Sequence, residues 1–180
     1  MTLEPNDSKL FYELIIPLMK FANDNFQINP NIPEDSDIGR FPPSQLKVIT
    51  DYIWTHTKII DKYMLNSELP DKKRMIVCRW KKAIHGNFIV ERHLKKGTVF
   101  ISEDLRKVFM VSGINSTIAE LIAEKRPPVL VNTTLLPFRD TIITDGLIEN
   151  YAIDFGGEYR KMFKDVYMNA KSQGTIISAI

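Results

Sequence analysis

The chain of 180 residues contains a single cysteine, Cys78. An internal disulfide needs two cysteines and a multi-cysteine zinc site needs more, so this count excludes both. One unpaired cysteine suits a reducing compartment, and we expect Cys78 to act as a small apolar side chain.

The sequence also lacks a membrane signature. The first residues, MTLEPNDSKL, contain no basic segment followed by a long apolar one. No run approaches the ~18 apolar residues that a membrane span requires. The composition, with 44% hydrophobic and 26% charged residues, is typical of soluble globular proteins. We therefore predict a cytoplasmic protein with no membrane partner and one substantial core.

Patterns for catalysis and cofactor binding are scarce. The three histidines, at 56, 85 and 93, show no spacing typical of metal sites, so we expect no metal and no cofactor. No serine has a GxSxG context, and Cys78 has no recognisable histidine partner. The sequence GGEYRK at 156–161 could hold an anion on the backbone of a helix start, but it matches no phosphate-binding glycine motif. We interpret it as a turn into a helix.

Helical periodicity dominates the first half of the chain, residues 1–86. Apolar residues recur every three or four positions, and Pro17 predicts a kink or break in the first helix. Whether these helices pack on the sheet of their own chain or present an apolar stripe to a second copy is left open, so a homo-oligomer is an alternative. The predicted elements are helices at 8–24, 44–66 and 70–85, and an extended proline-containing linker at 25–43.

The second half, residues 87–180, changes to the period of β-strands. Gly97 fits the left-handed position of a hairpin turn, and Thr117 with Glu120 forms a capping-box pattern that opens a short helix. Apolar spacing predicts a terminal helix at 158–173. The predicted fold is therefore α+β: N-terminal helices, a curved antiparallel sheet or small barrel of about six strands, and a C-terminal helix packed on it.

The stretch TTLLPFRDTIITDG, residues 133–146, admits two interpretations. Pro137 cannot donate to a sheet ladder, which favours a strand, a corner and a second strand, with Asp140 and Asp145 in the turns. The alternative is a site in which the two aspartates do chemistry. We favour the turns.

Four motifs in the second half resemble a family of bacterial proteins of uncharacterised function. They are WKxxxxGxF from Trp80, VxRHLKKGxxF from Val90, LLPFxxxIxxDGLI from Leu135 and YxxAKxxGxII from Tyr167. The resemblance covers residues 80–178 and implies a shared fold. It implies no activity and no catalytic residue.

The strongest charge asymmetry lies between Lys72 and Lys96, where nine basic residues face one acid, Glu91. A basic helix face beside a basic hairpin tip would attract a polyanion. We therefore predict a non-catalytic binding module whose partner is nucleic acid or an acidic protein, although a solubilising face would give the same pattern. The predicted binding residues are Arg74, Arg79, Lys81, Lys82, Arg92, Lys95 and Lys96.

The alternative is a hydrolytic or metal-dependent enzyme. Glu91 and His93 stand two apart on one predicted strand, so their side chains share a face. A carboxylate from a later strand, Asp145 and perhaps Asp140, would complete a His and carboxylate site.

Overall fold

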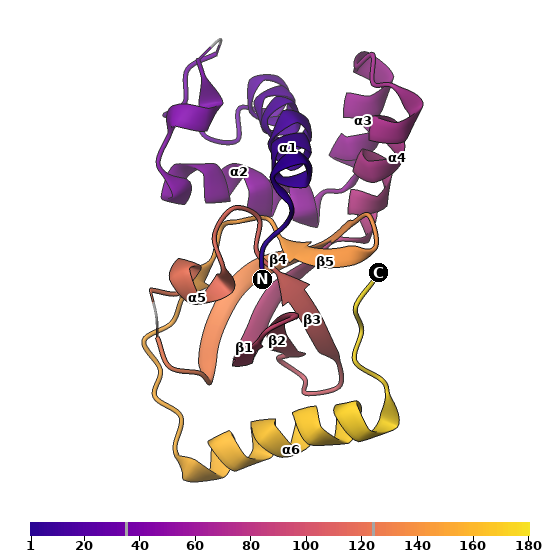
Figure 1. Cartoon of the computed structure of the whole chain (residues 1–180). Coiled ribbons are helices and arrows are strands. Elements are labelled where there is room, and N and C mark those ends of the chain that lie inside the picture. The colour runs from indigo at the N-terminus through magenta and orange to yellow at the C-terminus, as the bar shows by residue number, and fades with distance from the viewer. Residues whose placement is uncertain (35, 124) are drawn as a thin grey trace.

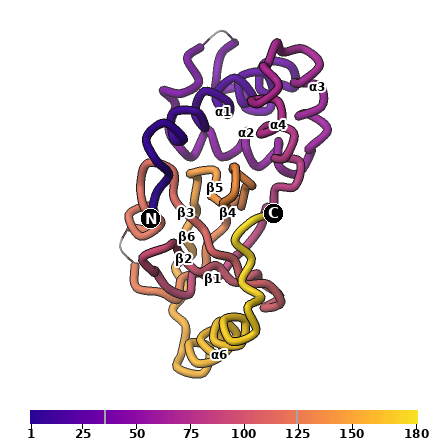
Figure 2. The backbone as a smooth tube through the Cα atoms, turned by 45° about the vertical axis from the view of Figure 1, so that its right-hand side comes forward, coloured from indigo at the N-terminus to yellow at the C-terminus, as the bar shows by residue number. Residues whose placement is uncertain are grey.

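The structure is a computed structural model that describes residues 1–34, 36–123 and 125–180. It confirms the α+β prediction and consists of three layers: helices α1–α4, a ring of strands, and helix α6 on the opposite side (Figures 1 and 2). None of the helices in these ranges has the length and apolar character that a membrane crossing needs. The helices are α1 (Pro5–Phe26), α2 (Pro43–Thr55), α3 (Lys58–Asn66), α4 (Asp71–Arg79), α5 (Ile118–Leu121) and α6 (Gly157–Gln173), with 3-10 turns η1 (Ile38–Arg40) and η2 (Trp80–Lys82).

The strands form one sheet in the order β1-β2-β3-β5-β4-β6. Because β1 also pairs with β4, five strands close into a ring, which is not a regular barrel, and β6 lies outside it. All pairs are antiparallel, as predicted, except β3 with β5, which is parallel. The strands are β1 (Ile84–Leu94), β2 (Gly97–Ser102), β3 (Val108–Ser112), β4 (Val129–Phe138), β5 (Thr141–Thr144) and β6 (Glu149–Asn150).

Strands β2, β3 and β5 are buried at nearly every position, so both of their faces are covered, whereas β1 is buried only at residues 88–90. Phe88 and Val90 point into the ring, whereas Ile89 between them packs against α6. From α6, Phe163 and Tyr167 cover this outer face. The terminal helix therefore begins one residue before the predicted position 158, ends at the predicted residue 173 and packs on the sheet as predicted.

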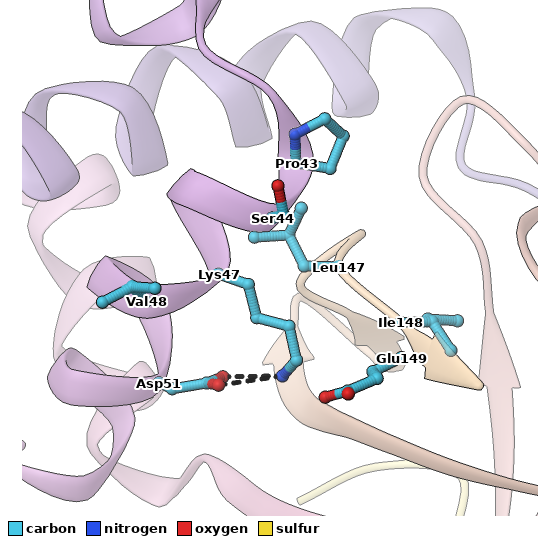
Figure 3. A pocket seen from close by; sticks show the side chains of 8 residues that line it. All are labelled: Pro43, Ser44, Lys47, Val48, Asp51, Leu147, Ile148 and Glu149. Atoms are coloured by element: carbon cyan, nitrogen blue, oxygen red, sulfur yellow. Dashed lines mark hydrogen bonds and ion pairs between the residues drawn. The ribbon is translucent and has the colours of Figure 1, made fainter. Parts of the chain in front are cut away.

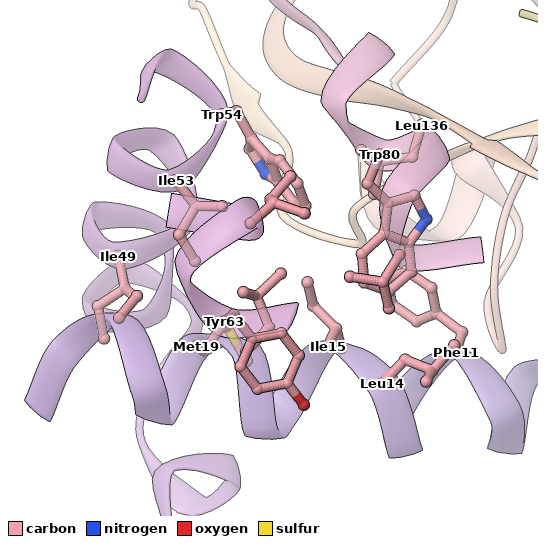
Figure 4. Packing of buried hydrophobic residues seen from close by; sticks show 14 of the residues in the cluster. Phe11, Leu14, Ile15, Met19, Ile49, Ile53, Trp54, Tyr63, Trp80 and Leu136 are labelled. Carbon is pink, nitrogen blue, oxygen red and sulfur yellow. The ribbon is translucent and has the colours of Figure 1, made fainter. Parts of the chain in front are cut away.

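A separate core joins the N-terminal helices to the top of the ring. Side chains from α1, α2 and α3 meet Leu136, Phe138 and Ile143 of β4 and β5. The Trp80 ring contacts those of Phe11 and Trp54 in this core (Figure 4). The N-terminal helices thus pack on the sheet of their own chain. The alternative of a homo-oligomer stays a prediction.

Two predictions for the helices need correction. Helix α1 continues through Pro17 without a break, and the proline lies exposed on its surface. The predicted helix at 44–66 is two helices, because the chain leaves helical geometry at His56. On one straight helix Trp54 and Ile59 would lie about 140° apart, but both are buried, so the turn is needed to bring both into the core.

The predictions made from local turn signals agree with the structure better than those helix predictions do. The capping box of Thr117 and Glu120 is present, and Gly97 has a φ of 140°. A side chain at Gly97 would meet the Val111 carbonyl oxygen at 2.9 Å, so only glycine fits this hairpin. The predicted helix at 70–85 is shorter: α4 ends at Arg79, the 3-10 turn η2 continues to Lys82, and β1 already begins at Ile84.

Candidate functional site

Two of the predicted binding arginines tie segments of the protein together. The Arg74 guanidinium donates to two backbone carbonyls at the end of α3. Arg79 donates to the carbonyl of Arg139 at 2.7 Å and to that of Ile180 at 3.2 Å. Both side chains are only partly exposed. A partner would have to compete with these internal hydrogen bonds.

Two further members of the set are paired. Lys81 lies 2.8 Å from the carboxylate of Asp61. Arg92 donates to Glu91, and its guanidinium lies 4.4 Å from the centre of the Tyr167 ring. Glu91, one of the candidate catalytic carboxylates, is therefore engaged, and its side chain is only 7% exposed.

The other three, Lys82, Lys95 and Lys96, are exposed and have no ion-pair partner in the described parts of the chain. Lys82 precedes β1 and the other two follow it, so the full length of that strand separates them. The structure does not gather the seven basic residues on one face.

The candidate acid and base residues do not converge either. Asp145 lies near His85, at the other end of β1 from His93. Its backbone N–H donates to the carbonyl of Thr134, and Thr134 pairs with His85 on β1. His93 lies eight residues further along β1, which is ~26 Å of strand. Its Nδ1 lies 2.9 Å from the hydroxyl of Thr98.

The two aspartates of residues 133–146 differ from one another. Asp140 is exposed in the turn between β4 and β5. Asp145 is 7% exposed; its Oδ1 accepts the N–H of Leu147 at 3.1 Å, and its Oδ2 accepts Trp54 Nε1 at 2.9 Å. Burial raises the pKa of Asp145 to about 6, against the lowering effect of these donors and of Lys47. Asp145 is a turn residue, as predicted, and also a buried acid, which was not.

Beside Asp145 lies a polar layer between α2 and the ring that sequence reasoning missed. The Lys47 ammonium donates to both oxygens of Asp51, at 2.9 and 3.0 Å, and to Asn132 Oδ1 at 2.9 Å. Asn132 in turn donates to Asn87 Oδ1 of β1. The only sequence signal was the spacing of Lys47 and Asp51, one helical turn apart.

His85 stands at the edge of this layer. Its Nδ1 lies 2.9 Å from the Thr134 hydroxyl and 3.7 Å from Asp51 Oδ1. Burial lowers the pKa of His85, Asp51 raises it, and Lys47 lowers it. A catalytic triad needs its acid and its nucleophile on opposite ring nitrogens. Here both contacts fall on the same nitrogen and Thr134 is fully buried, so the geometry is not that of a triad.

A groove of about 420 Å³ opens between α2 and residues 147–149 (Figure 3). Lys47 and Asp51 form its floor, and Glu149 stands on its rim.

A second hollow, of about 470 Å³, lies at the N-terminal end of α6 and is cationic. Its described lining residues include Lys125, Arg126 and Arg160, one carboxylate, Asp154, and Tyr151. We call it the cationic pocket. Arg160 is held in place by hydrogen bonds to the carbonyls of two segments, residues 127 and 155. Sequence reasoning missed it because its basic residues come from positions more than 30 residues apart.

The protein is thus an α+β protein whose mixed sheet closes into a ring, and its surface hollows include the groove beside α2 and the cationic pocket. Within the described ranges, no three His, Cys, Asp or Glu side chains are arranged to hold a metal ion. Comparison with family models, with curated proteins and with solved structures finds no match.

Proposed function

We propose that the protein is a non-catalytic binding module that takes single-stranded nucleic acid, with phosphate groups in the cationic pocket. The carrying observation is its charge: among the described residues that line the pocket, three basic side chains stand against one carboxylate. The proposed binding surface differs from the one expected from the sequence, because four of the seven basic residues predicted to bind make hydrogen bonds or ion pairs within the protein.

The cations of the pocket are available to a ligand. Lys125 and Arg126 are exposed and have no ion-pair partner in the described parts of the chain. Arg160 uses two of its N–H groups on carbonyl oxygens, which leaves three of the five that a guanidinium offers. Contacts from Lys and Arg to phosphate supply most of the sequence-independent affinity for nucleic acid.

Two neighbouring features favour an extended polyanion. The start of α6 presents free backbone N–H groups and the positive end of the helix dipole. Lys164 lies one turn along α6 from Arg160, so it continues the basic flank. Tyr151 in the pocket wall offers an aromatic edge of the kind that single-stranded nucleic acids contact.

The test is fluorescence anisotropy with a labelled 12-nucleotide single strand at ~50 and ~200 mM salt. Wild type is expected to bind at low salt and to weaken as salt rises. The variant Lys125→Glu/Arg126→Glu should lose most of this binding, and its salt slope should fall by about 1.4. Lys58→Glu/Lys72→Glu, with the same change in net charge at exposed sites elsewhere, is the matched control.

Other outcomes separate the alternatives. If Lys95→Ala/Lys96→Ala loses binding and Lys125→Glu/Arg126→Glu keeps it, the oligonucleotide binds the surface expected from the sequence and not the cationic pocket. Competition by poly-glutamate as strong, per charge, as by the oligonucleotide would assign the pocket to an acidic protein. Failure of wild type to bind at ~50 mM salt would overturn the proposal.

A further inference from the structure

The groove between α2 and residues 147–149 has the opposite chemistry to the cationic pocket. Its walls are apolar: Pro43 and Val48 come from α2, and Leu147 and Ile148 come from the facing segment (Figure 3). Val48 is 49% exposed, so this wall is open to solvent. A volume of about 420 Å³ is within the range of ligand sites and accommodates a long side chain.

Lys47, the one cation among the described residues that line the groove, cannot serve an anionic ligand. An ammonium group has three N–H donors, and those of Lys47 are directed to the two oxygens of Asp51 and to Asn132. The Lys47 side chain is 13% exposed, so it is fixed in the floor. The described lining residues of the groove therefore offer hydrogen-bond acceptors to a ligand and no ammonium group that is free to bind an anion.

Its acceptors are carboxylates. Asp51 is 33% exposed and retains lone pairs beyond those that Lys47 occupies. Glu149 is exposed, has no ion-pair partner within the described ranges, and points its carboxylate toward the Lys47 end of the groove (Figure 3). Two carboxylates face one ammonium, so the site carries a net negative charge.

We propose that this groove binds a lysine or arginine side chain of a partner polypeptide. The aliphatic stem would lie between Val48 and Leu147, and the cationic head would reach Glu149 and Asp51. Tyr52 lies one turn from Val48 on α2 and is 36% exposed. This apolar stripe continues beyond the groove, which gives a polypeptide a second contact that a small amine would not use. The proposal does not depend on the cationic pocket.

The test is isothermal titration at ~50 mM salt with two capped hexapeptides, one of alternating valine and lysine and the other with acetyl-lysine in place of lysine. The lysine peptide is expected to bind at least tenfold more tightly, since acetylation removes the charge. Glu149→Gln should weaken binding about fivefold, as expected for a partly exposed ion pair, and Glu149→Lys should abolish it. Because Glu149 is exposed, neither change threatens folding; Glu68→Lys, at another exposed site, is the matched control.

Amide shifts of Val48 and Leu147 on titration of the lysine peptide would place it in the groove. Equal binding of both peptides, or no effect of Glu149→Lys, would overturn the proposal, and so would spermidine that binds as tightly as the lysine peptide. Lys125→Glu/Arg126→Glu should bind the lysine peptide normally, so failure of the nucleic-acid proposal is distinguishable from failure of this one.

Discussion

Trp54 Nε1 donates a hydrogen bond of 2.9 Å to Oδ2 of Asp145, so an indole from α2 holds a carboxylate at the end of β5. The contact joins residues 91 positions apart and fastens the helical layer to the ring.

Replacement of Asp145 by Asn should remove a pH dependence of stability. The pKa of Asp145 in the folded protein, about 6, lies above its ordinary value of 3.8, so the folded state binds the proton more tightly. The contribution of Asp145 to the free energy of unfolding therefore falls as pH rises from about 4 to 6, and the cost of the buried charge is complete above that range. Urea denaturation should show wild type gaining about 1.5 kcal/mol over Asp145→Asn between pH 7 and pH 5. A stability difference between wild type and Asp145→Asn that is the same at pH 7 and pH 5 would contradict the raised pKa of Asp145.

The two tryptophans should respond differently to replacement by Phe. Trp54→Phe removes a donor from a buried carboxylate, which costs about 1.5–3 kcal/mol at pH 7. Trp80 is fully buried, but its Nε1 has no hydrogen-bond partner in the described structure, so Trp80→Phe loses packing and no hydrogen bond. Urea denaturation at pH 5, where Asp145 gains its proton, should reduce the cost of Trp54→Phe and leave that of Trp80→Phe unchanged. Equal pH dependence of the two variants would argue against the Trp54 contact.

The charges of Lys47 and Asp51 should move the pKa of His85 in opposite directions. Lys47 lowers it and Asp51 raises it. An NMR titration of the His85 ring should therefore show a higher pKa in Lys47→Met and a lower one in Asp51→Asn. Lys58→Met, which removes an exposed lysine from α3, is the control and should leave the titration unchanged. A shift of the same sign in both variants would rule out this arrangement of charges.

Two neighbouring basic residues should differ in their effect on stability. Arg79 donates to the carbonyls of Arg139 and Ile180, so Arg79→Ala should lower the free energy of unfolding by about 1–2 kcal/mol. Lys82 is exposed and has no ion-pair partner in the described ranges, so Lys82→Ala should change it by less than about 0.5 kcal/mol. Thermal or urea denaturation of both variants decides the matter; a harmless Arg79→Ala would mean that its guanidinium is free for a ligand.

The sequence predicts what depends on neighbours along the chain. The capping box of Thr117 and Glu120, the glycine turn at Gly97 and the terminal helix are all decided within a few residues, and all are confirmed. The division of the predicted helix at His56 could not be foreseen, because it depends on where the core requires Trp54 and Ile59.

The candidate sites depend on contacts between distant segments. The sequence around Asp145 is that of a turn. Its burial depends on the helical layer, from which Trp54 donates to its carboxylate. The basic run from Lys72 to Lys96 is conspicuous in sequence, but no local pattern reveals that Arg79 bonds to residues 139 and 180 or that Arg92 lies on Tyr167. Charge counted along a chain does not measure the charge that a surface presents.

The parallel pair of β3 and β5 is the shortest seam of the ring. Only Val111 and Ser112 face Ile142 and Ile143 there, whereas β1 pairs with β4 over seven residues. Local opening is cheapest where the fewest hydrogen bonds and contacts must break. The ring will therefore part first at this seam, and amide hydrogen exchange will be fastest there among its strands. An open seam presents two unpaired strand edges, which makes it the point at which a destabilised copy can join another edge to edge.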